Sequence, residues 1–310
     1  MTTYHVTIFG INLTINPVAF SIGGWEIYWY GVIIACGFAL ALLYAFRNSK
    51  RFGIDIDRLL DVVLVTAPIA VLCARAYYLL FDPSGVGIKS FTQFFGFDGS
   101  GFQGLAIYGG VIGAAVVGTL MCKLRKINIP ATLDMAAIGF LIGQGIGRWG
   151  NFMNQEAFGA ATGSSFWGMT SENVAAELGE GVLAHPCFLY ESVWCLAGFV
   201  VLHILSKKKQ YNGQIALGYC LWYGVGRTII EGLRTDSLYL WGTGIRVSQA
   251  LSLLLVIASA SVLVVMEARR RKQKNDATYE NVFGEIEYTI ITEENEGEKV
   301  EEETPDDQDN

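Results

Sequence analysis

Polar and charged side chains gather in one short stretch, GRWGNFMNQEAFG at residues 147–159. The stretch contains an arginine, two asparagines, a glutamine and a glutamate, and it directly follows the apolar segment DMAAIGFLIGQGI. An arginine stays protonated in proteins, and its planar guanidinium is suited to binding phosphate or carboxylate. We therefore expect Arg148 to require an anion, either a glutamate of the chain or the phosphate of a lipid.

A second polar group follows a helical spacing farther along the chain. Tyr223, Arg227, Glu231 and Arg234 lie four, four and three residues apart, which places all four on one face of a helix. Arg227 and Glu231 could form an intrahelical ion pair whose only role is to compensate their burial. Alternatively, this face and GRWGNFMNQEAFG serve one anion-binding site.

The composition is that of a membrane protein. Hydrophobic residues make up 52% of the 310 residues and charged residues 16%, and the mean hydropathy is +0.38. Several apolar segments approach the roughly 20 residues that a helix needs to cross a bilayer. We expect an all-α polytopic membrane protein with about seven transmembrane helices. The predicted spans are residues 22–46, 59–81, 104–124, 131–147, 187–205, 214–232 and 247–266.

Basic clusters indicate the orientation of these spans. They follow the first, third, fifth and seventh spans and are missing after the even-numbered ones. By the positive-inside rule the basic loops are cytoplasmic, which places the N-terminus outside and the C-terminus in the cytoplasm. GRWGNFMNQEAFG then lies at the external end of the fourth span and begins an external loop over residues 148–186.

Three regions follow from this topology: an external N-terminal arm (residues 1–21), a seven-helix domain (22–268) and a tail (269–310). The tail is first basic and then acidic; residues 275–310 contain 14 of the 29 acidic residues and one base, Lys299. Such a composition predicts disorder. The first 274 residues carry 21 basic and 15 acidic side chains, a net charge of +6, which we attribute to topology and not to nucleic-acid binding.

Ionisable residues inside spans are costly and mark functional sites. Most of them lie toward the external side, including Glu26 and Arg75, whereas Asp61 and Asp134 stand out on the cytoplasmic half. An arginine-lined site at the outer leaflet suggests a phospholipid substrate. The chain lacks the G-x-S-x-G and H-E-x-x-H motifs and has three histidines, so we expect a transferase without metal or cofactor. A lipid or anion transporter would spread its charges across the bilayer, and a scaffold or receptor would not need the motif.

Three blocks of the sequence resemble one protein family. GRWGNFMNQEAFG is similar to the signature of the prolipoprotein diacylglyceryl transferases, G-R-x-G-N-F-x-N-x-E-x-x-G. HPCFLYES resembles the family's H-P-x-x-L-Y-E, and WYGVGRTIIEGLRTD its Y-G-x-x-R-x-x-x-E-x-x-R. The resemblance runs from about residue 20 to 268. It implies transfer of a diacylglyceryl group from phosphatidylglycerol to the lipobox cysteine of a prolipoprotein signal peptide, in the plasma (inner) membrane of a bacterium, with the site near the external leaflet.

The resemblance also implies roles for individual residues. Arg148 and Arg227 bind the lipid phosphate and stabilise its departure, Glu156 and Glu231 orient the arginines, and Gly159 permits the turn of the loop. The candidate catalytic residues are Arg148, Arg227, Tyr108, Glu156 and Glu231. The candidates for binding phosphatidylglycerol are Arg148, Asn151, Asn154, Gly159, Tyr30, Tyr223, Arg227 and Arg234. His185, Tyr190 and Glu191 are assigned to the structure of the loop.

The group that activates the acceptor thiol is left open by the sequence. Many family members have histidine in a G-L-x-x-H-G-G motif, whereas this chain reads GLAIYGG, with Tyr108 at that position. A tyrosine with a pKa near 10 is a poor base at neutral pH. Either Tyr108 positions the substrate, or a carboxylate or the field of the arginines favours the thiolate. His185 is an alternative base, although its H-P motif also suits a structural role.

Overall fold

Helices form most of the structure, a computed structural model that describes residues 3–23, 25–81, 87, 90–95, 104–235, 239, 244 and 246–275. The long helices are α1 (Trp29–Asn48), α2 (Ile56–Leu80), α4 (Ile107–Leu124), α5 (Ile129–Asn154), α7 (Cys187–Ser206), α8 (Gln214–Glu231) and α9 (Val247–Asn275). Shorter helices are η1 (Lys50–Phe52), α3 (Phe91–Phe94) and α6 (Glu172–Leu178). The predicted acidic tail beyond residue 275 lies outside the described residues.

The prediction of an all-α polytopic membrane protein is confirmed. Within the described residues, six helices are long and apolar enough to cross a bilayer, namely α1, α2, α4, α5, α7 and α9. The remaining predicted span is a helix as well, α8, but it is more polar because it carries residues such as Gln214, Arg227 and Glu231. It packs against α5, α7 and α9, and Arg227 pairs with Glu191 of α7.

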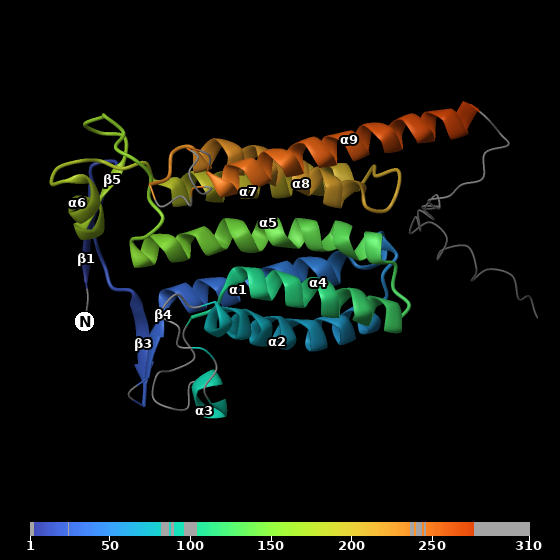
Figure 1. Cartoon of the computed structure of the whole chain (residues 1–310), viewed down its shortest axis with the longest axis horizontal. Coiled ribbons are helices and arrows are strands. Elements are labelled where there is room, and N and C mark those ends of the chain that lie inside the picture. Colours follow the sequence, from blue (N-terminus) through green and yellow to red (C-terminus); the bar gives the residue numbers. More distant parts are fainter. Residues whose placement is uncertain are drawn as a thin grey trace, which may run out of the picture.

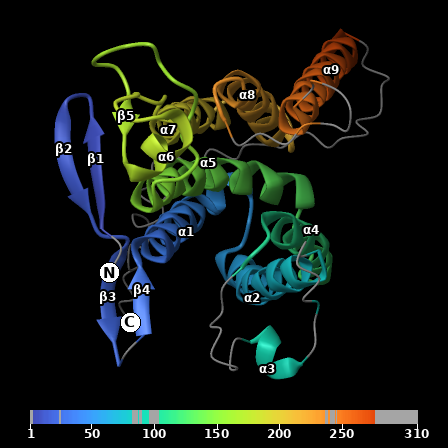
Figure 2. The ribbon, with the colours of Figure 1, turned by 60° about the vertical axis from the view of Figure 1, so that its left-hand side comes forward.

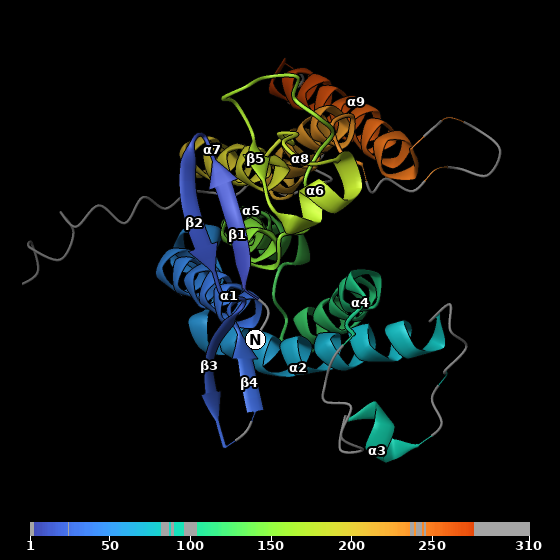
Figure 3. The same cartoon turned by 90° about the vertical axis from the view of Figure 1, so that its left-hand side faces the viewer.

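Helix α5 lies in the middle of the bundle (Figure 1). It packs against α1 on one side and against α7 and α8 on the other, and α9 covers α8. Helices α2 and α4 pack closely on each other and lie on the side of α5 away from α8 and α9 (Figure 3). Half of the α5 window that could span the membrane is buried in the protein, which explains why this helix tolerates polar residues.

Strands precede the first helix, and the sequence analysis did not predict them. Strand β1 (Tyr4–Ile8) pairs with β2 (Ile11–Ile15) and with β5 (Met169–Thr170) in the order β2-β1-β5, and β3 (Val18–Ile22) forms a hairpin with β4 (Trp25–Tyr28). Figure 2 shows the β1–β2 hairpin above the β3–β4 hairpin, so that the two follow one another end to end. The prediction that the first helix begins at residue 22 is therefore wrong by seven residues.

The two ends of the bundle differ in what they carry. We call the end near β5 and α6 the sheet end; α5 finishes there, and α7 begins there (Figure 1). We call the opposite end, where η1 and the starts of α2, α5 and α8 meet, the basic end. A core cluster at the basic end includes Phe52, Leu59, Met135 and Ile215, and it joins the two halves of the bundle.

Candidate anion-binding site

The last turns of α5 carry the first part of the site. The fourth span was predicted to finish at residue 147, but α5 continues to Asn154 and ends where Gln155 adopts a left-handed conformation with φ of 51°. Arg148, Asn151 and Asn154 are therefore helical and not part of the loop. Their spacing of three places them on one face of α5, and the connection to α7 starts seven residues later than expected.

The carboxylate of Glu191 is the centre of the site. Glu191 lies in the first turns of α7 and is 5% exposed. Its Oε2 accepts an ion pair from Arg148 Nη2 at 2.7 Å, and its Oε1 contacts Arg227 Nη1 at 3.0 Å and Arg234 Nη1 at 3.4 Å. Three arginines from α5, α8 and the segment after α8 thus converge on one buried carboxylate. From the sequence, a glutamate of the chain was one predicted partner of the arginines, and Glu191 was assigned to the loop. In the structure Glu191 is that partner.

Two further contacts hold Arg227 and the end of α8. Glu231 Oε2 lies 2.7 Å from Arg227 Nη2, one turn along the helix, so the intrahelical ion pair that the spacing predicted is present. Arg246 donates to the backbone carbonyl of Glu231. Arg246 was not identified from the sequence, because nothing in its local sequence links it to a residue 15 positions earlier.

Glu156 joins the site through an amide. Asn151 Nδ2 donates to Glu156 Oε1 at 2.8 Å, and Arg148 Nη1 donates to Asn151 Oδ1 at 3.4 Å. Glu156 therefore acts on Arg148 through Asn151. Asn154 is the last residue of α5, and it is half-buried.

Gly159 is needed for space and not for a turn. The left-handed positions after α5 are Gln155 and Ala157, with φ of 51° and 58°. A Cβ on Gly159 would lie 2.7 Å from the carbonyl oxygen of Leu233 and 2.8 Å from His185 Cβ. The Gly159 N–H donates to the carbonyl of His185 at 2.9 Å. This close approach brings the segment after α8, which includes Arg234, against the segment after α5.

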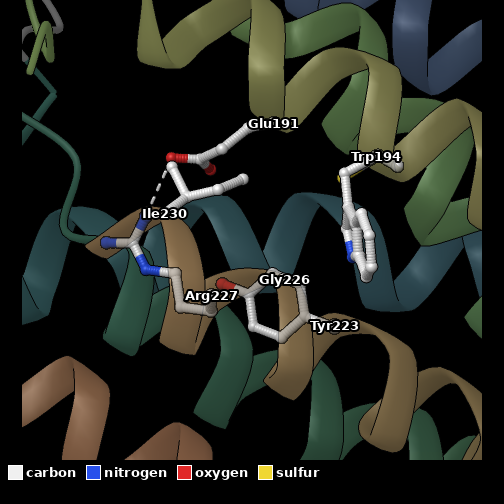
Figure 4. A pocket seen from close by; sticks show the side chains of 7 residues that line it. Glu191, Trp194, Tyr223, Gly226, Arg227 and Ile230 are labelled. Atoms are coloured by element: carbon white, nitrogen blue, oxygen red, sulfur yellow. Dashed lines mark hydrogen bonds and ion pairs between the residues drawn. The ribbon is translucent and has the colours of Figure 1, made fainter. Parts of the chain in front are cut away.

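A small, open pocket lies beside the cluster, with about 210 Å³ of empty space that includes open solvent. Figure 4 shows the Arg227 guanidinium pointing to Glu191, with Tyr223 and Trp194 beyond it. One part of its lining is charged, from Glu191 and Arg227, and the rest is largely apolar, from Trp194, Cys195 and Ile230. Its lining therefore places a charged group next to apolar side chains.

Two tryptophans join α7 to α8 next to the pocket. Trp194 Nε1 donates to the carbonyl of Trp222, and Trp222 Nε1 donates to the carbonyl of Trp194, both at 3.0 Å, with the rings stacked 4.6 Å apart. Gly198 and Gly226 leave room for the indoles, since a Cβ on either would lie within 2.4 Å of an indole nitrogen. The sequence analysis did not identify this pair.

Tyr30 and the loop residues lie around the cluster. Tyr30, near the start of α1, is exposed and packs on α5, where a Cβ on Gly150 would lie 2.7 Å from its ring. His185 Nδ1 and Tyr190 Oη are 3.2 Å apart, and Tyr190 Oη accepts from Trp167 Nε1 at 2.7 Å. His185 and Tyr190 thus connect the start of α7 to the long loop, and within the described residues neither is hydrogen-bonded to the arginines.

Tyr108 and Arg75 lie apart from this network. Tyr108 opens α4, is 58% exposed and has its ring 6.4 Å from that of Tyr77 in α2. Arg75 donates to the carbonyls of Gln93, Phe94 and Gly104. The structure therefore brings together the candidates on α5, α7 and α8 but leaves Tyr108 in the α2–α4 pair.

The charges of the site favour an anion. Among the residues that the structure describes, four arginines (Arg148, Arg227, Arg234 and Arg246) face three glutamates (Glu156, Glu191 and Glu231), a formal excess of one positive charge. An arginine cannot be neutralised by losing its proton, so the excess persists at all physiological pH values. The fold and the site define a multi-pass helical membrane protein with an arginine-lined site at one end.

Comparison with known proteins identifies the family. The family model for prolipoprotein diacylglyceryl transferase matches residues 17–265. Phosphatidylglycerol--prolipoprotein diacylglyceryl transferase of Bacillus velezensis is 40% identical over 274 residues, covering 86% of this chain and 96% of the relative. The proteins of that name from Pediococcus pentosaceus and Clostridioides difficile are 41% and 40% identical, each over 86% of this chain and over 96% and 100% of their own length. The chain belongs to the prolipoprotein diacylglyceryl transferase family and is a transferase.

Proposed function

We propose that this protein transfers the sn-1,2-diacylglyceryl group of phosphatidylglycerol to the sulfur of the lipobox cysteine in bacterial prolipoproteins. The relatives that share about 40% of its residues carry both substrates in their name. The observation that carries the proposal is the convergence of Arg148, Arg227 and Arg234 on Glu191 beside a pocket that is largely apolar.

The reaction exchanges one carbon–oxygen bond for one carbon–sulfur bond. The cysteine sulfur attacks the glyceryl carbon that carries the phosphate ester, and the bond from that carbon to the ester oxygen breaks. The products are a thioether and glycerol phosphate, and the thiol proton is released to the phosphate or to water. Negative charge grows on the departing phosphate oxygens in the transition state.

The arginines are placed to stabilise this departure. Fixed positive charge near a developing oxyanion lowers the barrier, and one such donor is worth about 100- to 1,000-fold in rate. Arg148 and Arg227 are the proposed ligands of the phosphate, with Arg234 at the edge of the cluster. Asn151, Asn154, Tyr30 and Tyr223 are proposed to bind the headgroup through hydrogen bonds.

We place the reaction at the external leaflet of the bacterial plasma membrane. The basic loops predict that the basic end is cytoplasmic, so the sheet end faces outward. A lipobox cysteine follows the apolar segment of its signal peptide and would reach the same surface. Phosphatidylglycerol in the outer leaflet would present its phosphate at that depth.

Activation of the thiol is proposed to come from the arginine field. Within the described residues, Tyr108 has a ring contact with Tyr77 and no hydrogen bond to the arginines. His185 Nδ1 is within hydrogen-bond distance of Tyr190 Oη. A free thiol has a pKa near 8.5, and neighbouring cations lower it. Four arginines close to the bound cysteine would favour the thiolate, while Tyr108 would act only in positioning the substrate.

The test is a reconstituted assay. The purified protein is incubated in neutral detergent with phosphatidylglycerol and a synthetic lipobox peptide, and the peptide mass is measured. We expect the mass to increase by one diacylglyceryl group and glycerol phosphate to appear in equal amount. A peptide with serine in place of cysteine is the control. Absence of the adduct, or an equal adduct on the serine peptide, would contradict the proposal.

A further inference from the structure

Glu191 places a carboxylate of the protein between the arginines that are proposed to bind the lipid phosphate, and the proposed reaction does not by itself require one there. The substrate brings its own negative charge, yet the arginines already share a buried carboxylate of the protein. Three guanidiniums converging on one point would repel one another if no anion lay between them. Glu231 pairs with Arg227, and Glu156 reaches Arg148 only through Asn151. Glu191 is the carboxylate that contacts all three arginines.

The residue next to Glu191 is hydrogen-bonded to α5 through its side chain. Ser192 Oγ donates to the carbonyl of Gly145 at 2.8 Å and accepts from Trp149 Nε1 at 3.2 Å. Ser192 and Glu191 are both buried. The carboxylate therefore has a fixed position relative to the end of α5, which carries Arg148. Its ion pairs hold the guanidiniums at that position.

Donors remain on two of the arginines after they have contacted Glu191. Arg148 uses Nη2 on Glu191 and Nη1 on Asn151, and Arg227 uses Nη1 on Glu191 and Nη2 on Glu231. In the part of the chain that the structure describes, the Nε–H groups of Arg148 and Arg227 donate to no protein acceptor. Such donors can bind phosphate oxygens without displacing the carboxylate.

The charge of Glu191 also matters for the product, on the assumption that the proposed function holds. The lipid phosphate is a diester with one negative charge, whereas glycerol phosphate is a monoester that approaches two at neutral pH. A cluster with one more positive charge would bind the product more tightly than the substrate. Glu191 lowers the net positive charge of the cluster by one, which allows the more negative product to leave.

We propose that Glu191 is a positioning residue with two effects: its reach holds Arg148, Arg227 and Arg234 converged for catalysis, and its charge limits the affinity of the site for glycerol phosphate. Two substitutions separate these effects. Glu191→Gln keeps the length of the side chain and loses the charge. Glu191→Asp keeps the charge and shortens the side chain by one methylene.

The experiment measures kcat, KM for phosphatidylglycerol, and the direct binding of glycerol phosphate to the purified folded protein in neutral detergent. For Glu191→Gln we expect kcat to fall about tenfold or more, because a neutral amide of the same length holds the guanidiniums less firmly than a carboxylate does. We expect glycerol phosphate to bind about threefold or more tightly, because one opposing charge is removed. For Glu191→Asp we expect a lower kcat with glycerol phosphate affinity within about twofold of the wild type. Glu172→Gln, outside the site, is the matched control and should change neither quantity.

A merely structural role would lower the folded yield and leave kcat and product affinity of the folded fraction unchanged, and this result would overturn the proposal. Unchanged or weaker glycerol phosphate binding in Glu191→Gln would contradict the claim that the charge of Glu191 limits product affinity. A wild-type kcat in Glu191→Asp would contradict the claim that the length of Glu191 holds the arginines converged. If the wild type transfers no lipid, the proposed function fails and the binding measurement still decides the charge effect. If Glu191→Gln does not fold, Glu191→Asp decides whether the residue positions the arginines.

Discussion

Both ends of the bundle contain buried ion pairs, but the two are built differently. At the basic end Lys209 Nζ lies 3.0 Å from Asp134 Oδ2, with side chains 1% and 0% exposed. Asp134 also accepts the backbone N–H groups of Gly213 and Ala216 at 2.9 Å. Lys209 donates to Asn212 and lies over the ring of Phe52 at 4.6 Å. One cation meets one anion, and hydrogen-bond partners surround both.

At the sheet end three arginines share one carboxylate, and the site is partly open. Arg148 is 23% exposed at its side chain and lies against a carboxylate that two other arginines share. At the basic end, burial lowers the pKa of Lys209, and the charge and hydrogen bond of Asp134 oppose this effect. The difference teaches that burial of charge alone does not mark a functional site. Several arginines that converge on one carboxylate next to a pocket are the better sign.

The largest expected effect comes from substitutions at the sheet end. Arg148→Ala or Arg227→Ala should lower kcat/KM for diacylglyceryl transfer by at least about 100-fold, because a donor to the departing phosphate is lost. The reconstituted assay measures the rate, and size-exclusion chromatography in detergent measures the folded yield. Arg125→Ala, which removes an exposed ion pair with Asp61 at the basic end, is the control and should retain its rate. Turnover of Arg148→Ala close to the wild type would break the comparison.

Substitutions at the basic end should change the stability of the protein and not the rate of transfer. Asp134→Asn leaves the Lys209 ammonium buried without its counter-ion, which should cost about 3 kcal/mol or more in the free energy of unfolding. The measurement is the midpoint of denaturation in detergent. Asp61→Asn, in a pair whose side chains are 49% and 41% exposed, is the matched control and should cost less than about 1 kcal/mol. Equal losses in both variants would show that the buried pair has no special role.

A smaller effect is expected at Tyr108, which belongs to neither ion-pair network. Loss of a general base typically lowers the rate by about 100-fold or more. Within the described residues Tyr108 contacts Tyr77 and is not hydrogen-bonded to the arginines. Tyr108→Phe should therefore reduce kcat by far less than about 100-fold. The pH dependence of kcat should also keep its shape. A loss as large as that of Arg148→Ala would instead place the hydroxyl in the reaction.

The smallest expected effect is a pH response at the sheet. Partial burial raises the pKa of Glu172, but hydrogen bonds from the His5 N–H to both carboxylate oxygens, at 2.9 and 3.0 Å, outweigh it and hold the pKa below its usual value. The stabilisation is complete above the unfolded carboxyl pKa of about 4.3 and is lost as the pH falls through the lower folded value.

Hydrogen exchange of the His5 amide checks this prediction. Its protection factor should fall as the solution is acidified below about pH 4, and Glu172→Gln should show the low protection at every pH. The arginine cluster gives the contrast, because its guanidiniums do not titrate in this range. Protection that does not depend on pH in the wild type would contradict the assignment.

The sequence predicted the helices well and their ends less well. Long apolar runs identify a membrane helix because the bilayer fixes their length. The segment at residues 22–28 is also apolar, and a short apolar run does not separate strand from helix, so β4 was assigned to the first helix. The end of α5 was placed too early because Arg148, Asn151 and Asn154 are polar. They remain helical since the surrounding helices supply their partners.

The site was predictable only where partners are near in sequence. Arg227 and Glu231 are one helical turn apart, so their ion pair could be expected. Arg148 and Glu191 are 43 residues apart, and Glu191 was assigned to the loop with its neighbour Tyr190. A signal did exist: Glu191 is a carboxylate placed inside an apolar segment at the depth of the arginines. Its pairing depends on how α5, α7 and α8 pack, which spacing along the chain does not contain.

The exchanged hydrogen bonds of Trp194 and Trp222 set a limit on how this enzyme can move. Sliding or rotation of α7 along α8 would break both bonds at once and drive each indole against the glycine opposite it. Glu191 precedes Trp194 by three residues and Arg227 follows Trp222 by five, so the pair keeps these side chains at a constant offset. Any opening that admits a lipid must therefore move other helices, such as α5 or α9, against α7 and α8, which would move as one unit.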